Sequence, residues 1–227
     1  MNWEFRAPTR TQMDFASLRQ LVKKGEGAQL EFKLKNNHPE KILRELVAFA
    51  NTNGGILLLG VSDDKEIKGL KFGEEDDFIL QKYIHSHISP PLSYENERFI
   101  LPDEREVLIY HIPASHSKPH FVMFSEPEPT KKAYIRVKDR SIQASKEVKN
   151  ILKGKSKSLN IKFNYGEKEQ ILMSLLEKDG FTTLETFKNA AAIPKKIASD
   201  TLVRLVLANL LYIEPSESED IYKMAKY

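Results

Sequence analysis

The sequence predicts an α+β domain built around a mixed sheet, followed by a smaller, mainly helical domain. Three observations lead to this fold class. Up to about residue 150, segments with helical periodicity alternate with segments of strand character. One strand, Ile56–Val61 (ILLLGV), is apolar on both faces, so we expect it in the middle of a sheet that is covered on both sides. Beyond residue 160 the pattern changes to three helices and a short hairpin.

Composition is consistent with two domains and excludes several classes of site. The chain has 227 residues, of which 41% are hydrophobic, so it can bury a core in one medium and one small domain. Cysteine is absent, which excludes disulfides and Cys-based zinc sites and suits a reducing cytoplasm. No apolar run reaches about 18 residues, and the N-terminus lacks the pattern of a secretory signal. We therefore expect a cytoplasmic protein with no membrane partner.

The first elements follow from periodicity and from residues that break it. Phe15–Lys24 has a helical apolar stripe, and two glycines end it. Gln29–Leu34 (QLEFKL) alternates, which predicts a half-buried strand with Glu31 and Lys33 on its solvent face. A second helix begins near Pro39, because proline suits a first helical turn.

The second helix ends at residues 51–55 (NTNGG), because Asn and Gly tolerate positive φ. A further helix runs from about Glu75 to Ile88, where Pro90-Pro91 stops it. Residues 125–130 (SEPEPT) predict an exposed hairpin loop, and Ser145–Lys153 predicts a helix. The remaining strands are expected at Leu92–Tyr94, Val107–Ile112, His120–Phe124 and Ala133–Val137.

The domain boundaries are placed at residues 1–153, a basic linker at 154–163, and a second domain at 164–227. The second domain is expected to contain helices Glu167–Lys178, Leu184–Ala191 and Pro194–Leu211, and a hairpin of Leu211–Glu214 with Ile221–Met224.

This order of elements resembles a winged helix. Its third helix would face the DNA major groove with the polar residues Lys195, Lys196, Ser199 and Arg204, while Ile197 points inward. The expected wing, residues 214–220 (EPSESED), is acidic and should repel phosphates. Dimerisation is therefore a second role open to this module.

Positive charge is concentrated in one region of a chain whose net charge is +3. Between Lys131 and Lys162, eleven Lys and Arg residues stand against Asp139 and Glu147. Such asymmetry is typical of proteins that bind a phosphate backbone, although a solvated linker would give the same count.

One segment inside this basic region alternates cations with other residues. Arg136, Lys138 and Arg140 share a parity, so one strand face carrying all three could meet a phosphate backbone. An ordinary exposed basic strand is the alternative.

Three acids and a lysine flank two predicted strands. Glu31 and Lys33 project from the same strand face, Glu26 comes just before that strand, and Asp63 follows the strand Ile56–Val61. If the strands are neighbours, this cluster suits Mg²⁺ or Mn²⁺, with Lys33 stabilising charge on a scissile phosphate. The alternative is a solvated strand face and a turn pair with purely structural roles.

Several ordered pieces carry a resemblance to a known family. They are Glu26–Lys33 (EGAQLEFK), Val47–Gly55 (VAFANTNGG), Leu59–Asp64 (LGVSDD), Ile67–Leu70 (IKGL), Pro119–Phe121 (PHF) and Ala133–Arg140 (AYIRVKDR). Over residues 14–150 the chain resembles the Schlafen AlbA-like domain, whose prokaryotic members are often labelled DNA-binding proteins or transcriptional regulators.

The resemblance implies two further points. Vertebrate Schlafens include ribonucleases whose acids sit at positions matching Glu26, Glu31 and Asp63. They also carry two such lobes in one chain, so we expect a homodimer of a chain that carries one. ATP binding has no support, because no GxxxxGK[ST] motif occurs.

The sequence therefore predicts a nucleic-acid-binding protein, directed at DNA rather than RNA and acting in transcriptional regulation. Two alternatives stay open: a metal-dependent endoribonuclease using Glu26, Glu31, Lys33 and Asp63 with Mg²⁺ or Mn²⁺, and a protein-interaction scaffold. No other cofactor is expected. The candidate nucleic-acid contacts are Arg136, Lys138, Arg140, Lys195, Lys196 and Arg204.

Overall fold

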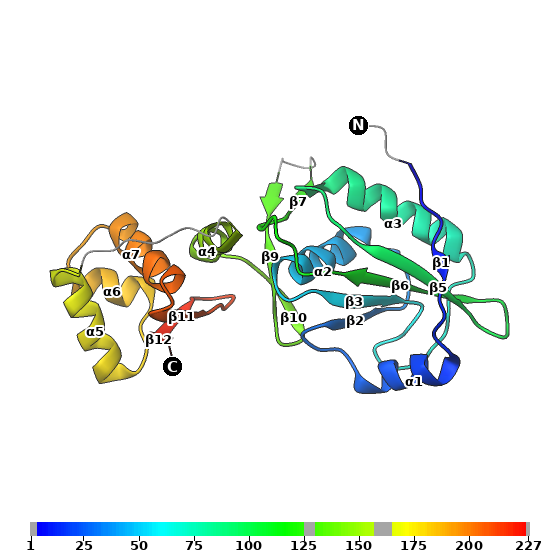
Figure 1. Ribbon diagram of the computed structural model, residues 1–227, viewed down its shortest axis with the longest axis horizontal. Helices are drawn as coiled ribbons and strands as arrows, with labels where there is room; N and C mark the ends of the chain where they lie inside the picture. The colour runs from blue at the N-terminus through cyan, green and yellow to red at the C-terminus, as the bar shows by residue number, and fades with distance from the viewer. Residues whose placement is uncertain (1–3, 125–129, 157–164, 226–227) are drawn as a thin grey trace. The chain divides into compact units, whose positions relative to one another are not determined.

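The computed structural model describes residues 4–124, 130–156 and 165–225 (Figure 1). The chain divides into two compact units, Met1–Ile142 and Gln143–Tyr227.

The first unit is built on a mixed five-stranded sheet. Its strand order is β1 (Thr9–Arg10), β5 (Glu95–Ile100), β6 (Glu106–Ile112), β3 (Gly55–Leu59) and β2 (Leu30–Lys33). β3 runs antiparallel to β6 and parallel to β2, so β2 is an edge strand beside a buried central strand. The predicted α+β fold with a mixed sheet is confirmed.

Helices cover both faces of this sheet (Figure 1). Along β3, Leu57 and Leu59 pack with α2 (Pro39–Asn51) and α3 (Gly73–His87), whereas Leu58 packs on the other face with α1 (Phe15–Lys24). All three leucines are fully buried. This burial on two faces is why ILLLGV is apolar throughout.

Short strands complete the first unit. β4 (Ile88–Ser89), β7 (Phe121–Phe124) and β8 (Thr130–Lys132) form one small sheet, and β9 (Tyr134–Val137) pairs with β10 (Arg140–Gln143). The strand predicted at Leu92–Tyr94 is wrong, because the chain enters the sheet only at Glu95. The strand that begins there, Glu95–Ile100 (ENERFI), is polar and only partly buried, so its sequence shows no clear apolar alternation. Residues 125–129 of the predicted hairpin loop lie outside the described residues.

The second unit contains α4 (Lys146–Ser156), α5 (Glu167–Asp179), α6 (Leu184–Ala190), α7 (Lys195–Leu207) and a hairpin of β11 (Leu211–Glu214) with β12 (Ile221–Met224). The predicted order of three helices and a hairpin is confirmed. α7 ends at Leu207, four residues earlier than predicted, and a short turn leads into β11. An isolated bridge joins Thr182 to Tyr222.

Helix α4 lies on the other side of the domain boundary from where the sequence placed it. Ile151 belongs to the core of the second unit, and a Cβ on Gly154 would lie 2.5 Å from the Leu207 side chain. The division therefore falls after Ile142 rather than after residue 153. Residues 154–156 of the expected linker are helical, and 157–163 lie outside the described residues. No helix in the described parts of the chain is long and apolar enough to span a membrane.

Candidate functional site

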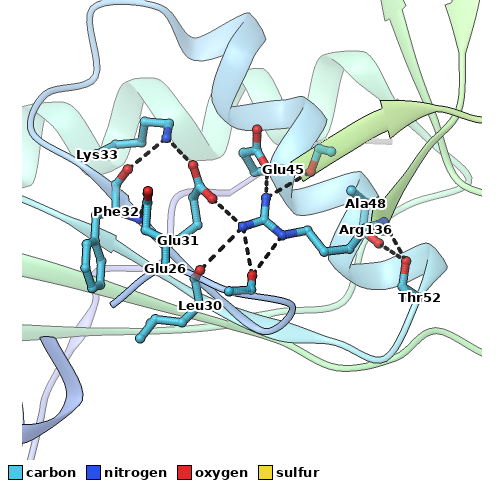
Figure 2. A network of polar contacts seen from close by, with 11 residues as sticks. Glu26, Leu30, Glu31, Phe32, Lys33, Glu45, Ala48, Thr52 and Arg136 are labelled. Atoms are coloured by element: carbon cyan, nitrogen blue, oxygen red, sulfur yellow. Dashed lines mark hydrogen bonds and ion pairs between the residues drawn. The ribbon is translucent and has the colours of Figure 1, made fainter. Parts of the chain in front are cut away.

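A buried arginine joins the edge strand β2 to helix α2 (Figure 2). The side chain of Arg136, in β9, is only 1% exposed. Its Nη2 donates to Oε2 of Glu31 and its Nη1 to Oε2 of Glu45, each at 2.5 Å. Nε and Nη2 also donate to the carbonyl of Gly27, at 3.1 and 2.9 Å. A guanidinium group whose donors meet two carboxylates and a carbonyl can be buried, since its charge and its hydrogen bonds are both satisfied.

Glu45 is the member of this cluster that the sequence did not indicate. Burial and then the charge of Glu31 raise the pKa of Glu45, while a hydrogen bond from Ser141 and the charge of Arg136 oppose that change. The only signal in the sequence was a glutamate beside the apolar stripe of α2, which is also the pattern of a solvated helix face.

The motif at residues 51–55 fixes the strand that carries Arg136. Nδ2 of Asn51 donates to the carbonyls of His120 and Tyr134, both at 2.9 Å, and its Oδ1 accepts from the backbone N–H of His120 at 2.7 Å. Oγ1 of Thr52 accepts from the backbone N–H of Arg136 at 2.9 Å (Figure 2). The C-terminal end of α2 is thereby locked to β9, so the motif does more than provide a turn.

Glycine is required at the end of this motif. Gly54 has a φ of +74°, which favours glycine, and a Cβ on Gly55 would collide with the ring of Phe49. The chain can therefore turn from α2 directly into the buried strand β3.

Side chains close the open edge of β2. The carboxylate of Glu26 accepts from the backbone N–H of Phe32 at 2.9 Å, and Nζ of Lys33 donates to the carbonyl of Phe32 at 2.8 Å (Figure 2). The carbonyl of Leu30 accepts from the N–H of Gly27 at 2.9 Å. An unpaired strand edge is a template for pairing with another chain, and these contacts occupy it.

The prediction that Glu31 lies on a solvated strand face is wrong. Glu31 is 6% exposed and binds both Arg136 and Lys33, because β9 and α2 cover this edge of the sheet. Leu34, the last residue of the predicted strand, lies beyond β2 and is 38% exposed.

The structure does not form the predicted three-carboxylate metal site. Partial desolvation raises the pKa of Glu26 despite the hydrogen bond from Phe32, and the negative charges of Glu31 and Asp63 act in the same direction. The three acids are thus near enough to interact. Glu31 is nevertheless taken by two cations, and Asp63 lies in an exposed turn. Within the described ranges, no group of three or more His, Asp and Glu residues could hold a metal ion.

The three cations predicted on one strand face are separated. β9 ends at Val137, Lys138 occupies the following turn with a φ of +56°, and Arg140 begins β10. Arg136 is buried in ion pairs, so it is not accessible to a phosphate in this structure. Lys138 and Arg140 are exposed.

Lys195, at the start of α7, is held by an acid of α6. Its Nζ lies 2.7 Å from the carboxylate of Glu185, and this hydrogen bond raises the pKa of Lys195. Hydrogen bonds from Lys188 and then Lys195 lower the pKa of Glu185 to about 2. Lys196 and Arg204 are exposed on the same helix.

The predicted polar face of α7 is wrong at two positions. Ser199 is 2% exposed, and its hydroxyl donates to Oε1 of Glu147 in α4 at 2.5 Å. Ile197, predicted to point inward, is 44% exposed. The reason is that α4 packs on α7, so the side of α7 that faces α4 is buried.

A second buried polar cluster lies between α3 and the sheet, and no pattern in the sequence indicated it. The carboxylate of Asp77 accepts from the hydroxyl of Tyr110, from Nδ2 of Asn96 and from Nε2 of Gln81. Burial raises the pKa of Asp77 and, with the charge of Asp77, raises the pKa of Tyr94 to about 12. The same Gln81 amide binds both backbone groups of Arg6, so this cluster fastens the N-terminal segment to α3.

Comparison with known proteins identifies a family whose model includes the residues of the polar cluster at the edge of β2. A family model described as "Schlafen, AlbA_2" matches residues 26–145, which is more than half of the chain. No curated protein matches. Among solved structures, the DIP2311 protein from Corynebacterium diphtheriae shares 16% identity with a TM-score of 0.36, over 77% of this chain and 32% of that one. This chain thus spans about a third of that protein, and so weak a likeness carries no structural argument.

The matched segment runs from Glu26 to Ser145, so it contains Glu31, Glu45 and Arg136 as well as the 51–55 motif. Membership of this family suggests a role in nucleic-acid binding. The chain belongs to the Schlafen AlbA_2 family.

Proposed function

We propose that this protein binds nucleic acid, with duplex DNA as its target, and that it acts in transcriptional regulation as a homodimer. The observation that carries the proposal is the family match over residues 26–145. The excess of cations between Lys131 and Lys162 supports it, because such an excess favours a phosphate backbone as partner.

We further propose that the second unit is a winged-helix module. Its order of three helices and a hairpin agrees with that fold, and the isolated Thr182–Tyr222 bridge joins the segment between α5 and α6 to the hairpin. The exposed Lys196 and Arg204 of α7 are candidate contacts here.

In the first unit, Lys138 and Arg140 are candidate contacts because both are exposed. Arg136 has a different part in this proposal. Its ion pairs with Glu31 and Glu45 hold β9 in place, and they leave no donor directed at solvent.

A metal-dependent ribonuclease would need Glu31 to leave two cations before it could bind a metal with Glu26 and Asp63. The structure therefore favours binding over cleavage, and the alternative becomes an outcome of the test.

The test uses the full chain with labelled duplex DNA and structured RNA, in Mg²⁺, Mn²⁺ or EDTA. We expect intact substrate and a mobility shift that weakens steeply as salt rises. Metal-dependent cleavage that Glu31→Ala or Asp63→Ala abolishes would make the protein a nuclease. If the protein produces neither a mobility shift nor cleavage, the protein-interaction scaffold is the remaining function.

A further inference from the structure

Helix α4 carries a stripe of lysines on the face that points away from its own unit. Lys146, Lys149 and Lys153 are spaced i, i+3 and i+7, which places them on one side of a helix. Lys146 and Lys153 are exposed and Lys149 is half-buried. We call these three residues the α4 lysine stripe.

The opposite face of α4 is fixed to α7. Ile151 is buried in the core of the second unit, and Gly154 lets the backbone approach Leu207. Glu147, the one acid of α4, also points to this side, where it accepts the hydrogen bond from Ser199. The lysine stripe is therefore held on a rigid element with no acid on its own face.

The stripe lysines differ from several lysines of the second unit. Lys168, Lys188, Lys195 and Lys223 each form an ion pair, whereas the stripe lysines, like Lys155, Lys178 and Lys196, do not within the described residues. No ion pair involves the stripe lysines anywhere in residues 4–124, 130–156 or 165–225. Like charges three and four residues apart repel, so the stripe weakens the isolated helix unless an anion offsets it.

We infer that the α4 lysine stripe binds the phosphate backbone of duplex DNA without reading its sequence. This inference rests on the proposed function and names the surface that carries it. Seven residues of helix span about 10.5 Å, so the three long side chains can reach neighbouring phosphates of one backbone. Lysines act as flexible point charges, which suits backbone contact rather than the reading of bases.

A membrane surface is a poorer partner for this helix. An amphipathic helix binds a bilayer by inserting its apolar face. In α4 the apolar residues Val148 and Ile151 are both buried, Ile151 in the core of the second unit, so they cannot insert.

The test compares three triple variants of the full chain with the wild type. The first is Lys146→Gln, Lys149→Gln and Lys153→Gln. The second replaces the same lysines by arginine, which keeps the charge. The third is a matched control, Lys23→Gln, Lys41→Gln and Lys82→Gln, which removes the same charge from three exposed lysines on separate helices.

Fluorescence anisotropy with short labelled duplex DNA gives Kd at several KCl concentrations, between roughly 50 and 200 mM. We expect the glutamine stripe variant to bind on the order of 100-fold more weakly near 0.1 M salt, with the slope of log K against log salt reduced by about 2.7. The arginine variant and the matched control should bind like the wild type. Thermal unfolding should show no loss of stability in the glutamine variant, because its removal of like charges relieves repulsion.

Three outcomes would overturn the inference. If the wild type binds and the stripe variant keeps its affinity and slope, the interface lies elsewhere and the proposed function survives. If the matched control weakens binding as much as the glutamine stripe variant does, the total charge of the protein rather than the stripe determines its affinity for DNA. If the wild type binds no duplex at all, or binds phosphatidylserine vesicles instead, the proposed function fails as well.

Discussion

The guanidinium group of Arg136 joins segments that are far apart in the chain. Its partners Gly27 and Glu31 lie 109 and 105 positions away, and Glu45 lies 91 positions away. The guanidinium group and the Glu31 carboxylate are thus buried beside the half-buried carboxylate of Glu45, and each depends on the others for its charge to be balanced.

At this scale we predict the effect of removing the arginine. Arg136→Ala leaves the buried Glu31 and the half-buried Glu45 without their shared cation, so the free energy of unfolding should fall by about 3–5 kcal/mol. Urea denaturation measures the loss, and Lys138→Ala is the control, because Lys138 is exposed two residues away.

A second variant separates charge imbalance from lost packing. Replacing Arg136, Glu31 and Glu45 together by methionine removes all three charges. This triple variant should recover much of the stability, because a buried ion pair can often be replaced by apolar residues of similar volume without loss. A loss below about 1 kcal/mol in Arg136→Ala would mean that the ion pairs add little, as exposed pairs do.

At the scale of elements, the end of α2 determines where β9 lies. Asn51 satisfies one donor and two acceptors of the backbone in two other segments, whereas the side chain of Asn53 is exposed in the same motif. Two asparagines that look equivalent in NTNGG therefore have different structural roles.

This difference leads to a matched pair of variants. Asn51→Ala leaves the N–H of His120 and the carbonyls of His120 and Tyr134 without partners in a buried place, so it should cost about 2–4 kcal/mol. Asn53→Ala should change the free energy of unfolding by no more than about 0.5 kcal/mol. Equal effects of the two substitutions would show that the motif acts only as a turn.

At the scale of the whole molecule, the chain is organised as two units with α4 in the second. The core of that unit includes Ile151 beside residues of α5, α6 and α7, so α4 completes it. The division follows buried apolar contacts rather than the point at which the sequence becomes basic.

Two fragments test this boundary. Residues 143–227 should unfold cooperatively, because the fragment keeps Ile151 in the core of the unit. Residues 154–227 should have a free energy of unfolding lower by about 1.5–3 kcal/mol, the contribution of burying the Ile151 side chain. Calorimetry of both fragments compares their melting temperatures. Equal stability would place α4 outside the core of the unit.

The sequence by itself determined the class of fold and the order of most elements. Local signals are strong where one face or both faces of an element are apolar, as in ILLLGV, in α1 and in the three helices and hairpin of the second unit. The partly buried strand Glu95–Ile100 was not predicted, because its polar residues show no such apolar periodicity.

Only the tertiary structure decided what the charged residues do. In the sequence Glu31 and Arg136 have the spacing of solvated strand residues, and nothing local shows that they meet each other and Glu45. Burial of a charge depends on partners that lie about a hundred residues away, so it cannot be deduced from periodicity. The same reason applies to α4, whose lysines form a face only because α7 covers its other side.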